Sequence, residues 1–232
     1  MRTSFLTRIF DLMYPRQCAM CAERLAASQS LLCAPCLLHI PLTGFEQHPY
    51  DNEMAQRFWR LIPIERAAAL FYYEAQSDLA RLIYQLKYYA RPEIGEHLGR
   101  ITAMHFAQTG FFEGIDAIVP VPLSRMRQWH RGYNQSMEIA RGVSFVTGIP
   151  IYQTVVKRVN FKQSQTHLDH WQRQQNAAHA FVLTNADKVK GKHLLLIDDV
   201  VTTGATATAL AQELLRAGDV RFSILSLGYT KS

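Results

Sequence analysis

The sequence has no hydrophobic run long enough to cross a membrane. A transmembrane helix needs roughly 20 consecutive apolar residues, and every apolar stretch here is far shorter. Residues 5–13 are apolar, but Arg8 and Asp11 interrupt them, and no small-residue cleavage site of a secretory signal follows. We therefore expect a cytoplasmic protein whose N-terminal stretch is a short amphipathic helix docked on the body, with docking at a membrane surface as the weaker alternative.

Internal repeats and low-complexity tracts are also absent from the sequence, which excludes repeat arrays and regions of biased composition. The 232 residues suffice for one medium domain plus a small appendage, and the apolar content of 48% is that of an ordinary globular protein. The 25 basic and 19 acidic side chains give a net charge of +6. This excess suits anionic ligands such as pyrophosphate or nucleic acid, but it is too small to choose between them.

No cysteine lies outside residues 18–36, where Cys18-x2-Cys21 and Cys33-x2-Cys36 form two pairs separated by eleven residues. Two such knuckles bring four thiolates to one tetrahedral point, and a cytosolic chain disfavours the alternative of disulfides. We predict a structural zinc ion, with a rubredoxin-like iron as its rival. Four protein ligands leave no open coordination position, so the metal would stabilise a segment too small for a core of its own. Whether this ribbon also binds nucleic acid or protein stays open.

Strand and helix patterns alternate along the rest of the chain, which predicts an α/β fold with a parallel sheet flanked by helices and right-handed crossovers. We divide the chain into an amphipathic lead and four-cysteine ribbon (1–45), a polar and aromatic linker (46–63) and a main domain (64–232). The expected strands are 66–73, 115–121, 154–159, 194–197 and 220–227. The expected helices are 79–86, capped by Ser77 or Asp78, and 98–106, 134–146, 170–180 and 207–216.

The most informative segment is 194–206, where a strand runs into two carboxylates and then into small residues. Residues 194–197 have the pattern of a buried parallel strand, and Asp198 and Asp199 close it, followed by a loop rich in threonine and glycine. Open α/β sheets bind ligands at this edge. The helix N-terminus that follows suits a phosphate, and the carboxylates suit sugar hydroxyls or hydrated magnesium. The simpler alternative is a strand, a turn and a helix whose first turn carries ordinary acidic residues.

A second candidate lies in 119–135, where a strand ends in Pro120-Val121-Pro122 and a basic loop leads into a helix. Three arginines, Arg125, Arg127 and Arg131, fall within seven residues ahead of the helix N-terminus, an arrangement that suits pyrophosphate. The loop follows an earlier strand of the same sheet, so we expect it to face the 194–206 segment across the switch point. The alternative is a solvated basic loop.

The polar run 161–179 fits poorly in a core and is predicted to be a mobile flap over a site. Its donors include Gln165, Arg173 and Asn176, and the alternative is a surface helix and loop. His130 and His167 are candidate proton donors, with a plain surface position as the simpler interpretation of each.

The 194–206 segment resembles the phosphoribosyl-pyrophosphate (PRPP) signature of type I phosphoribosyltransferases. The resemblance implies that Asp198 and Asp199 are catalytic and face the ribose hydroxyls, with a magnesium ion joining ribose and pyrophosphate. It implies that the 5′-phosphate and ribose are held by Val200, Thr202, Thr203, Gly204, Ala205 and Thr206. It also implies pyrophosphate contacts from Lys87, Ser124, Arg125, Arg131, Gln165 and Arg173, the last two arriving with the flap.

From about Pro15 to Thr230 the chain resembles the ComF family of bacterial phosphoribosyltransferase-like proteins. The matching features are the paired Cys-x2-Cys ribbon, Lys87-Tyr88, the Val-Pro-Val-Pro-Leu loop, Arg131-Gly132-Tyr133-Asn134-Gln135, Gln165 with Arg173 and Asn176, and the PRPP signature. The family is associated with DNA uptake in natural competence. The resemblance implies a type I phosphoribosyltransferase-like parallel sheet flanked by helices, with a small N-terminal four-cysteine zinc ribbon.

Two functions stay open at this point. The first is magnesium-dependent phosphoribosyl transfer to an unknown acceptor, where Tyr229 could stack on an acceptor base or could equally belong to the core. The second is a non-catalytic module that senses PRPP or a nucleotide, or that handles single-stranded DNA with proteins of the competence machinery. Trp129 and Tyr133 beside arginines would support nucleic-acid contacts, but we expect these aromatics to be buried. The sequence does not reveal the oligomeric state.

Overall fold

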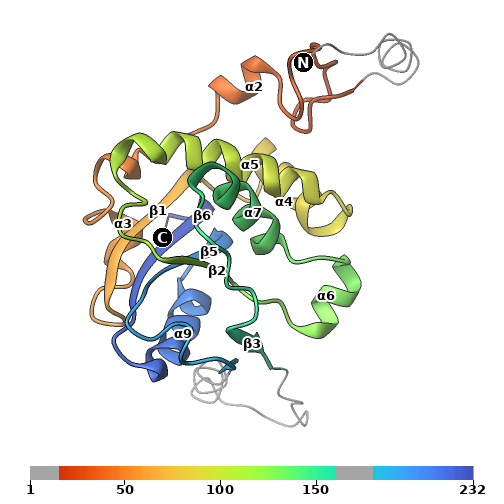
Figure 1. The fold of residues 1–232 in the computed structure, drawn as a ribbon. Coiled ribbons are helices and arrows are strands. Elements are labelled where there is room, and N and C mark those ends of the chain that lie inside the picture. Colours follow the sequence, from red (N-terminus) through yellow and green to blue (C-terminus); the bar gives the residue numbers. More distant parts are fainter. Residues whose placement is uncertain (1–15, 160–179, 232) are drawn as a thin grey trace, which may run out of the picture.

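A computed structural model describes residues 16–159 and 180–231 of the chain (Figure 1). Several predictions therefore lie outside the described residues. These are the amphipathic lead, the polar helix 170–180 except for its last residue, and the roles of Gln165, His167, Arg173 and Asn176. The strands are β1 (Ile64–Tyr72), β2 (Ala117–Pro120), β3 (Val156–Arg158), β4 (Phe181–Leu183), β5 (His193–Val201) and β6 (Arg221–Tyr229). The helices are α2 (Ala34–Leu38), α3 (Glu53–Gln56), α4 (Asp78–Tyr88), α5 (Pro92–Phe106), α6 (Arg125–Arg131), α7 (Gln135–Thr147) and α9 (Ala205–Leu214), with short 3-10 turns at Phe45–Gln47, Ala107–Thr109 and Leu215–Ala217.

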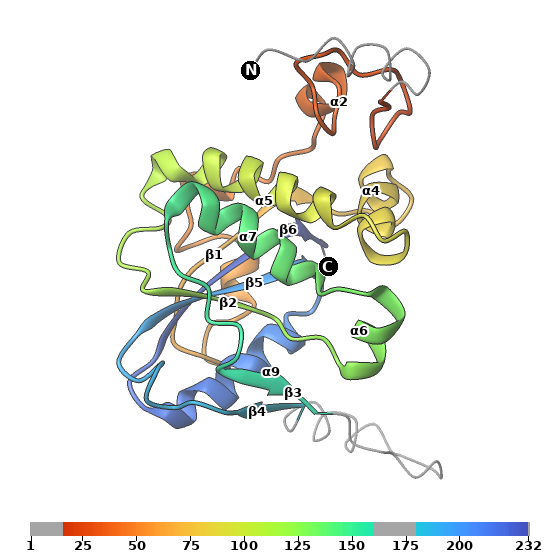
Figure 2. The same ribbon diagram turned by 45° about the vertical axis from the view of Figure 1, so that its right-hand side comes forward.

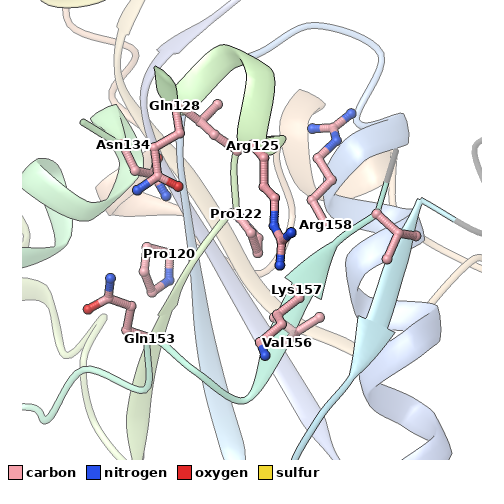
Figure 3. Close-up of a pocket in the computed structure, with 11 residues that line it drawn as sticks. Pro120, Pro122, Arg125, Gln128, Asn134, Gln153, Val156, Lys157 and Arg158 are labelled. Carbon is pink, nitrogen blue, oxygen red and sulfur yellow. The ribbon is translucent and has the colours of Figure 1, made fainter. Parts of the chain in front are cut away.

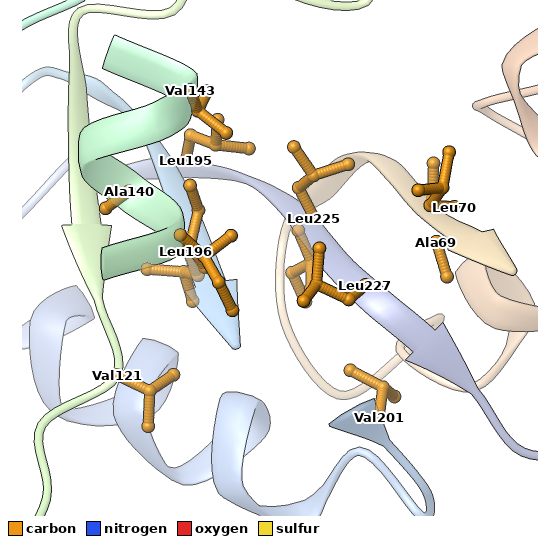
Figure 4. Packing of buried hydrophobic residues seen from close by; sticks show 14 of the residues in the cluster. Ala69, Leu70, Val121, Ala140, Val143, Leu195, Leu196, Val201, Leu225 and Leu227 are labelled. Carbon is orange, nitrogen blue, oxygen red and sulfur yellow. The ribbon is translucent and has the colours of Figure 1, made fainter. Parts of the chain in front are cut away.

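The main sheet has the order β1-β6-β5-β2 and is parallel throughout, which confirms the predicted α/β fold class. Residues Leu194 to Ile197 of β5 are fully buried, as expected for a parallel strand covered on both faces. Helices α5 and α7 cover one face, and α9 lies on the opposite side (Figure 2). Ala140 and Val143 of α7 pack over Leu195 and Leu196 of β5 (Figure 4).

One expected strand does not join this sheet. The 154–159 segment forms β3, which pairs antiparallel with β4 in a separate two-stranded sheet. The structure shows why the pattern was misleading: Val156 is buried while Lys157 is exposed, so β3 alternates like a strand with one wet face and is not buried on both faces.

Helices α5 and α7 approach each other unusually closely, and two glycines make this contact possible. A Cβ atom on Gly142 would lie 2.1 Å from the carbonyl oxygen of Glu96, and one on Gly99 would lie 2.3 Å from that of Ile139. Because both distances are far inside van der Waals contact, only glycine fits at either position. The close approach fixes α7, whose first turn reaches the end of β5.

The segment 46–63 packs against the main sheet. Asn52 caps α3, and its side-chain nitrogen donates to the carbonyl oxygen of Ala67 in β1 at 2.8 Å. The side chains of Met54, Ala55 and Phe58 are fully buried. The domain boundaries at residues 45 and 63 stay a prediction, but this middle segment is anchored to the core that follows it.

Candidate ligand-binding site at the carboxyl end of the sheet

Asp198 and Asp199 are the sixth and seventh of the nine residues of β5, near the carboxyl edge of the sheet. The ladder with β6 continues past them, since Asp198 is paired with Ser226 and Val201 with Tyr229. The expected strand 194–197 ends four residues before the observed end of β5 at Val201, so both acids lie within a hydrogen-bonded strand. The carboxylate of Asp198 accepts from the backbone N–H of Asp199 at 2.9 Å, and that of Asp199 accepts from the N–H of Val200 at 2.7 Å. These bonds hold both side chains in one orientation.

The two acids differ in their electrostatic surroundings. Burial, reinforced by the negative charge of Asp199, raises the pKa of Asp198 to about 7. The hydroxyl of Ser136, in the first turn of α7, donates to Asp198 at 3.1 Å and opposes this shift. The carboxylate of Asp199 instead forms an ion pair with the Nζ atom of Lys87 at 3.1 Å. Near neutral pH Asp198 is therefore protonated for part of the time, beside the carboxylate that pairs with Lys87.

Helix α4 delivers Lys87 to this site. The Ser77 hydroxyl caps the helix by accepting from the N–H of Ala80 at 3.1 Å, as one of the two predicted caps. A buried stripe, formed by Leu79, Leu82, Ile83 and Leu86, then fixes its rotation. Lys87 follows in the last turn, where its side chain turns toward Asp199. The structure therefore brings Lys87 to the predicted aspartates, although its predicted contact with pyrophosphate is untested.

The loop that links β5 to α9 has the geometry of an anion site. Gly204 adopts a φ of +77° and stands immediately before α9 as its N-cap residue, where it has no side chain to cap the helix. Thr202, Thr203 and Ala205 are exposed, while the Thr203 hydroxyl accepts from the N–H of Ala205 at 3.4 Å. The first N–H groups of a helix carry partial positive charge and attract phosphate.

Two residues that sequence reasoning assigned to a linker hold this loop in place. Arg57 donates to the carbonyl oxygen of Thr202, to that of Thr230 at 3.0 Å and to the hydroxyl of Tyr229 at 2.6 Å. The ring of Phe58 lies directly beneath Gly204. The signal that could have revealed this segment is Asn52 as a cap, followed by apolar side chains at 54, 55 and 58, one helical face.

The basic segment after β2 is a helix and not the predicted loop. Ser124 is buried, and its hydroxyl caps α6 by accepting from the N–H of Arg127 at 3.3 Å. The arginines consequently separate along α6. Arg125 lines a cavity beside β3 (Figure 3). Arg131 donates to Gln135 at 2.9 Å and stacks on the ring of Tyr88, 5.2 Å from its centre.

Three aromatic and histidine assignments are now settled. Trp129 is 81% exposed, so the expectation that it is buried is wrong, because α6 packs no buried side chain of its own. Tyr229 is only 1% exposed and belongs to the core, so it does not present its ring to an acceptor base. His130 is exposed, which agrees with the simpler surface interpretation.

The cavity beside α6 has a volume of about 740 Å³. It opens between the end of β2, helix α6 and strand β3 (Figure 3). The residues that line it are Pro120, Pro122, Leu123, Arg125, Gln128, Asn134, Gln153, Val156, Lys157, Arg158 and Val159. Sequence reasoning named Arg125 from this set as a ligand contact but missed Lys157 and Arg158.

The four cysteines form a second, separate centre. Their sulfur atoms all lie within 4.8 Å of one another, and those of Cys21 and Cys33 are 3.6 Å apart. Tetrahedral zinc with Zn–S bonds near 2.3 Å places sulfurs roughly 3.8 Å apart, so the cluster fits a structural zinc ion. The segment docks on the main body, where Gln85 of α4 donates to the Ala19 carbonyl at 2.7 Å and Ser30 contacts His97 of α5 at 3.1 Å.

Across residues 16–159 and 180–231, no helix has both the length and the apolar character that a membrane span requires.

Comparison with known proteins gives relatives over most of the chain, although no protein-family model matches. The DNA utilization protein YhgH of Escherichia coli O6:H1 is 32% identical over 209 residues, covering 87% of this chain and 85% of that protein. The competence protein F of Haemophilus influenzae is 38% identical over 104 residues, covering 44% of this chain and 45% of that protein.

Similar solved structures include an allosteric regulatory enzyme of purine biosynthesis, with 21% identity and a TM-score of 0.42 over 60% of this chain. The chain spans 29% of the length of that enzyme. An adenine phosphoribosyltransferase has 14% identity and a TM-score of 0.38, covering 62% of this chain and 82% of its own.

Proposed function

The chain belongs to the ComF/YhgH family of competence and DNA-utilization proteins, and from this premise we propose that it binds PRPP with magnesium and transfers the phosphoribosyl group. The observation that carries the proposal is the placement of Asp198 and Asp199 on β5 directly before the Gly204 loop and the N-terminus of α9. A single ligand with ribose hydroxyls and a 5′-phosphate would satisfy both features at once.

Each described residue then has a role set by its position. Asp198 and Asp199 hold the ribose hydroxyls, and the backbone N–H groups from Gly204 to Thr206 bind the 5′-phosphate. Lys87 already neutralises Asp199 at 3.1 Å and stands ready to contact pyrophosphate. Arg125 and Arg131 lie at opposite ends of α6, so they approach a ligand from different directions. The contacts assigned to Gln165 and Arg173 stay a prediction.

The charge at the aspartates supports a divalent cation. Burial, and after it the negative charge of Asp199, raises the pKa of Asp198 to about 7, and a hard cation with oxygen ligands relieves the repulsion between the two carboxylates. Asp198 and Asp199 would hold magnesium, which would supply positive charge to offset the charge of the pyrophosphate. Ser136 orients the Asp198 carboxylate from the opposite side, through its 3.1 Å hydrogen bond.

In the proposed reaction the bond between ribose C1 and pyrophosphate breaks and the acceptor forms a new bond at C1. Positive charge develops on the ribose ring as pyrophosphate leaves with the bonding electrons. The Asp199 carboxylate stabilises this charge, Lys87 stabilises the leaving pyrophosphate, and the start of α9 holds the 5′-phosphate in place, so positioning and electrostatics suffice without a covalent nucleophile.

Calorimetric titration of the zinc-loaded protein with PRPP and magnesium tests the proposal. We expect micromolar affinity, roughly −8 kcal/mol, in the wild type and its loss in Asp198→Asn/Asp199→Asn. Asp187→Asn removes a carboxylate from an exposed turn and serves as the matched control. Equal affinity in the double variant and the control would overturn the placement of the site, and no binding in any protein would overturn the PRPP proposal.

The second candidate function, handling of single-stranded DNA, is favoured by exposed aromatic side chains near cations. Trp129 is 81% exposed, and Tyr84 and Tyr88 lie with ring centres 4.6 Å apart on the outside of α4. Bases stack on such rings, and nearby arginines bind the phosphate backbone. Binding of a labelled oligonucleotide that weakens with salt, is reduced by Trp129→Ala and is unaffected by Asp199→Asn would establish this function.

A further inference from the structure

The segment 131–135 connects α6 to α7 and lies on the same side of the molecule as the end of α4 (Figures 1 and 2). The Asn134 side chain donates to the carbonyl oxygen of Val121 at 3.0 Å and caps α7 by accepting from the N–H of Ser136 at 3.1 Å. The hydroxyl of Ser136 in turn donates to the carboxylate of Asp198 at 3.1 Å. These bonds give the segment a fixed position relative to the proposed ribose site.

Tyr133 joins this segment to the last turn of α4. Its ring is half-buried and packs against the hydrophobic core, and its hydroxyl donates to the backbone carbonyl oxygen of Leu86, the residue before Lys87. Burial raises the pKa of Tyr133 to about 12, against the smaller opposing effect of a hydrogen bond from the Arg91 backbone. The hydroxyl therefore keeps its proton near neutral pH and remains a donor to α4.

The end of α4 has few other constraints on its backbone. The last carbonyl groups of a helix have no partner within the helix, and the hydrogen bond from the N–H of Tyr89 to the carbonyl oxygen of Gln85 satisfies one of them. The chain then turns through Ala90 at a φ of +51°, a left-handed conformation that costs free energy for a residue with a Cβ atom. Such a helix end frays unless tertiary contacts hold it, and Tyr133 supplies one at Leu86.

The position of Lys87 depends on this last turn. Its Nζ atom lies 3.1 Å from the Asp199 carboxylate, and the two side chains are 25% and 13% exposed. Asp199 stands within the ladder between β5 and β6, whereas Lys87 is the last residue but one of α4. A long lysine side chain loses rotamer freedom when it pairs, so the pair persists only if the helix end is held. A loosened last turn would displace the ammonium group and leave Asp199 in place.

We propose that Tyr133 is a positioning residue, which acts through the end of α4 to hold Lys87 in place against Asp199 and the leaving pyrophosphate. The inference deepens the proposed function and rests on it, since the contact of Lys87 with pyrophosphate is part of that proposal. A second link runs in parallel, because Arg131 stacks on the ring of Tyr88. Loss of the Tyr133 hydroxyl should therefore loosen the last turn of α4 without unfolding the helix.

Lysine labelling with an acetylating N-hydroxysuccinimide ester, measured by mass spectrometry, tests the inference without any ligand. The ion pair with Asp199 should slow acetylation of Lys87 in the wild type, and Asp199→Asn gives the rate for an unpaired Lys87. We expect Tyr133→Phe, which keeps the ring and removes only the hydroxyl, to raise the rate roughly threefold or more. Lys190 on an exposed turn is the internal reference, and Tyr50→Phe at an exposed tyrosine is the matched control.

Calorimetric titration with PRPP and magnesium shows whether Tyr133 acts through Lys87. Tyr133→Phe should weaken binding roughly threefold to tenfold in the wild type. In Lys87→Gln the same change should weaken binding less than about twofold, because the group that Tyr133 positions is then missing. A purely structural loss would weaken binding by the same factor in both backgrounds. Equal factors would overturn the inference, and so would a Tyr133→Phe protein that matches Tyr50→Phe in labelling.

The two experiments distinguish failure of the inference from failure of the proposed function. Without PRPP binding to the wild type the proposed function would be overturned, and the labelling rates would still decide whether Tyr133 holds Lys87 against Asp199. PRPP binding that is lost in Asp198→Asn/Asp199→Asn but unchanged in Tyr133→Phe would overturn the inference and leave the proposed function standing.

Discussion

Asp198 makes the stability of the protein depend on pH in an unusual direction. Its pKa is raised to about 7 in the fold, whereas an unfolded aspartate titrates near 3.9. The folded state therefore binds a proton that the unfolded state lacks between these values, and stability falls as the pH rises through this window. Above pH 7 Asp198 is ionised in the folded state, so the protein has then lost all of the stability that the raised pKa provides at lower pH.

We expect Asp198→Asn to stabilise the free protein at pH 8 by up to about 4 kcal/mol, the limit set by roughly three pKa units, and to change little near pH 4. The asparagine side-chain oxygen can still accept from Ser136 and from the Asp199 N–H. Urea unfolding of both proteins at several pH values measures the difference. Asp187→Asn is the control, and a stabilisation that does not shrink toward pH 4 would contradict the assignment.

Lys87 contributes to the site through its charge. Its ammonium group lowers the pKa of Asp198 and pairs with Asp199 at 3.1 Å, so Lys87→Gln should move the pKa of Asp198 further upward. The same change should weaken PRPP binding roughly tenfold because one charged contact is lost. Carboxyl NMR titration and calorimetry measure the two effects. Lys87→Arg keeps the charge and should restore most of both; a pKa that falls or stays constant in Lys87→Gln would count against this role.

At the scale of single elements, the turn into α9 is the most constrained. Gly204 has a φ of +77°, and an added Cβ atom would lie 2.8 Å from the ring of Phe58. We predict that Gly204→Ala destabilises the protein by about 1–2 kcal/mol from the backbone alone, with a further cost from the ring contact, and that it weakens PRPP binding.

The double variant Gly204→Ala/Phe58→Leu separates the two causes. Relative to Phe58→Leu, the alanine should then cost only the backbone strain, since the ring edge is gone. Thermal unfolding of the four proteins gives the coupling energy. Gly114→Ala, at a φ of +70° with nothing near its Cβ position, is the matched control for strain without a contact.

The helices and strands also show which parts of the fold can be predicted from the sequence. The strands of the main sheet, α4 with its Ser77 cap and α7 with its Asn134 cap carry their own local signals, so they were predictable. Helix α6 was missed because it buries none of its residues and has no apolar periodicity. Strand β4 was missed because three residues give too short a pattern.

The candidate site likewise contains residues that the sequence predicts and contacts that it does not predict. Asp198, Asp199 and the Gly204 loop are adjacent in the sequence, so one segment revealed them. The Arg57 contact with Thr202 joins residues 145 apart, and the Ser136 bond to Asp198 joins residues 62 apart. Such pairings follow only from the packed sheet, and no local pattern predicts them.

For the molecule as a whole, the four-cysteine segment should behave as a metal-dependent unit on a metal-independent body. Two polar contacts, Gln85 to Ala19 and Ser30 to His97, join it to α4 and α5. We expect one zinc ion per chain, and Cys33→Ser should abolish metal binding and increase hydrogen exchange in residues 16–40 while β5 and β6 stay protected.

Elemental analysis and hydrogen-exchange mass spectrometry check this prediction, and Ser30→Ala serves as a control that keeps all four thiols. An iron–thiolate absorption spectrum of the purified protein would show that the bound metal is iron and not zinc. Loss of protection throughout the main sheet in Cys33→Ser would contradict the independence of the body.

The order of the strands in the parallel sheet also delays pairing of β1 while the chain is synthesised. Strand β1 ends at Tyr72, but its hydrogen-bonding partner β6 begins only at Arg221. At about 5–20 residues per second, the ribosome needs roughly 7–30 s to make the intervening stretch. During that interval the apolar residues Ala67 to Phe71 have no neighbouring strand and are open to wrong partners. A nascent chain of this protein is therefore a natural client for a chaperone until the last strand emerges.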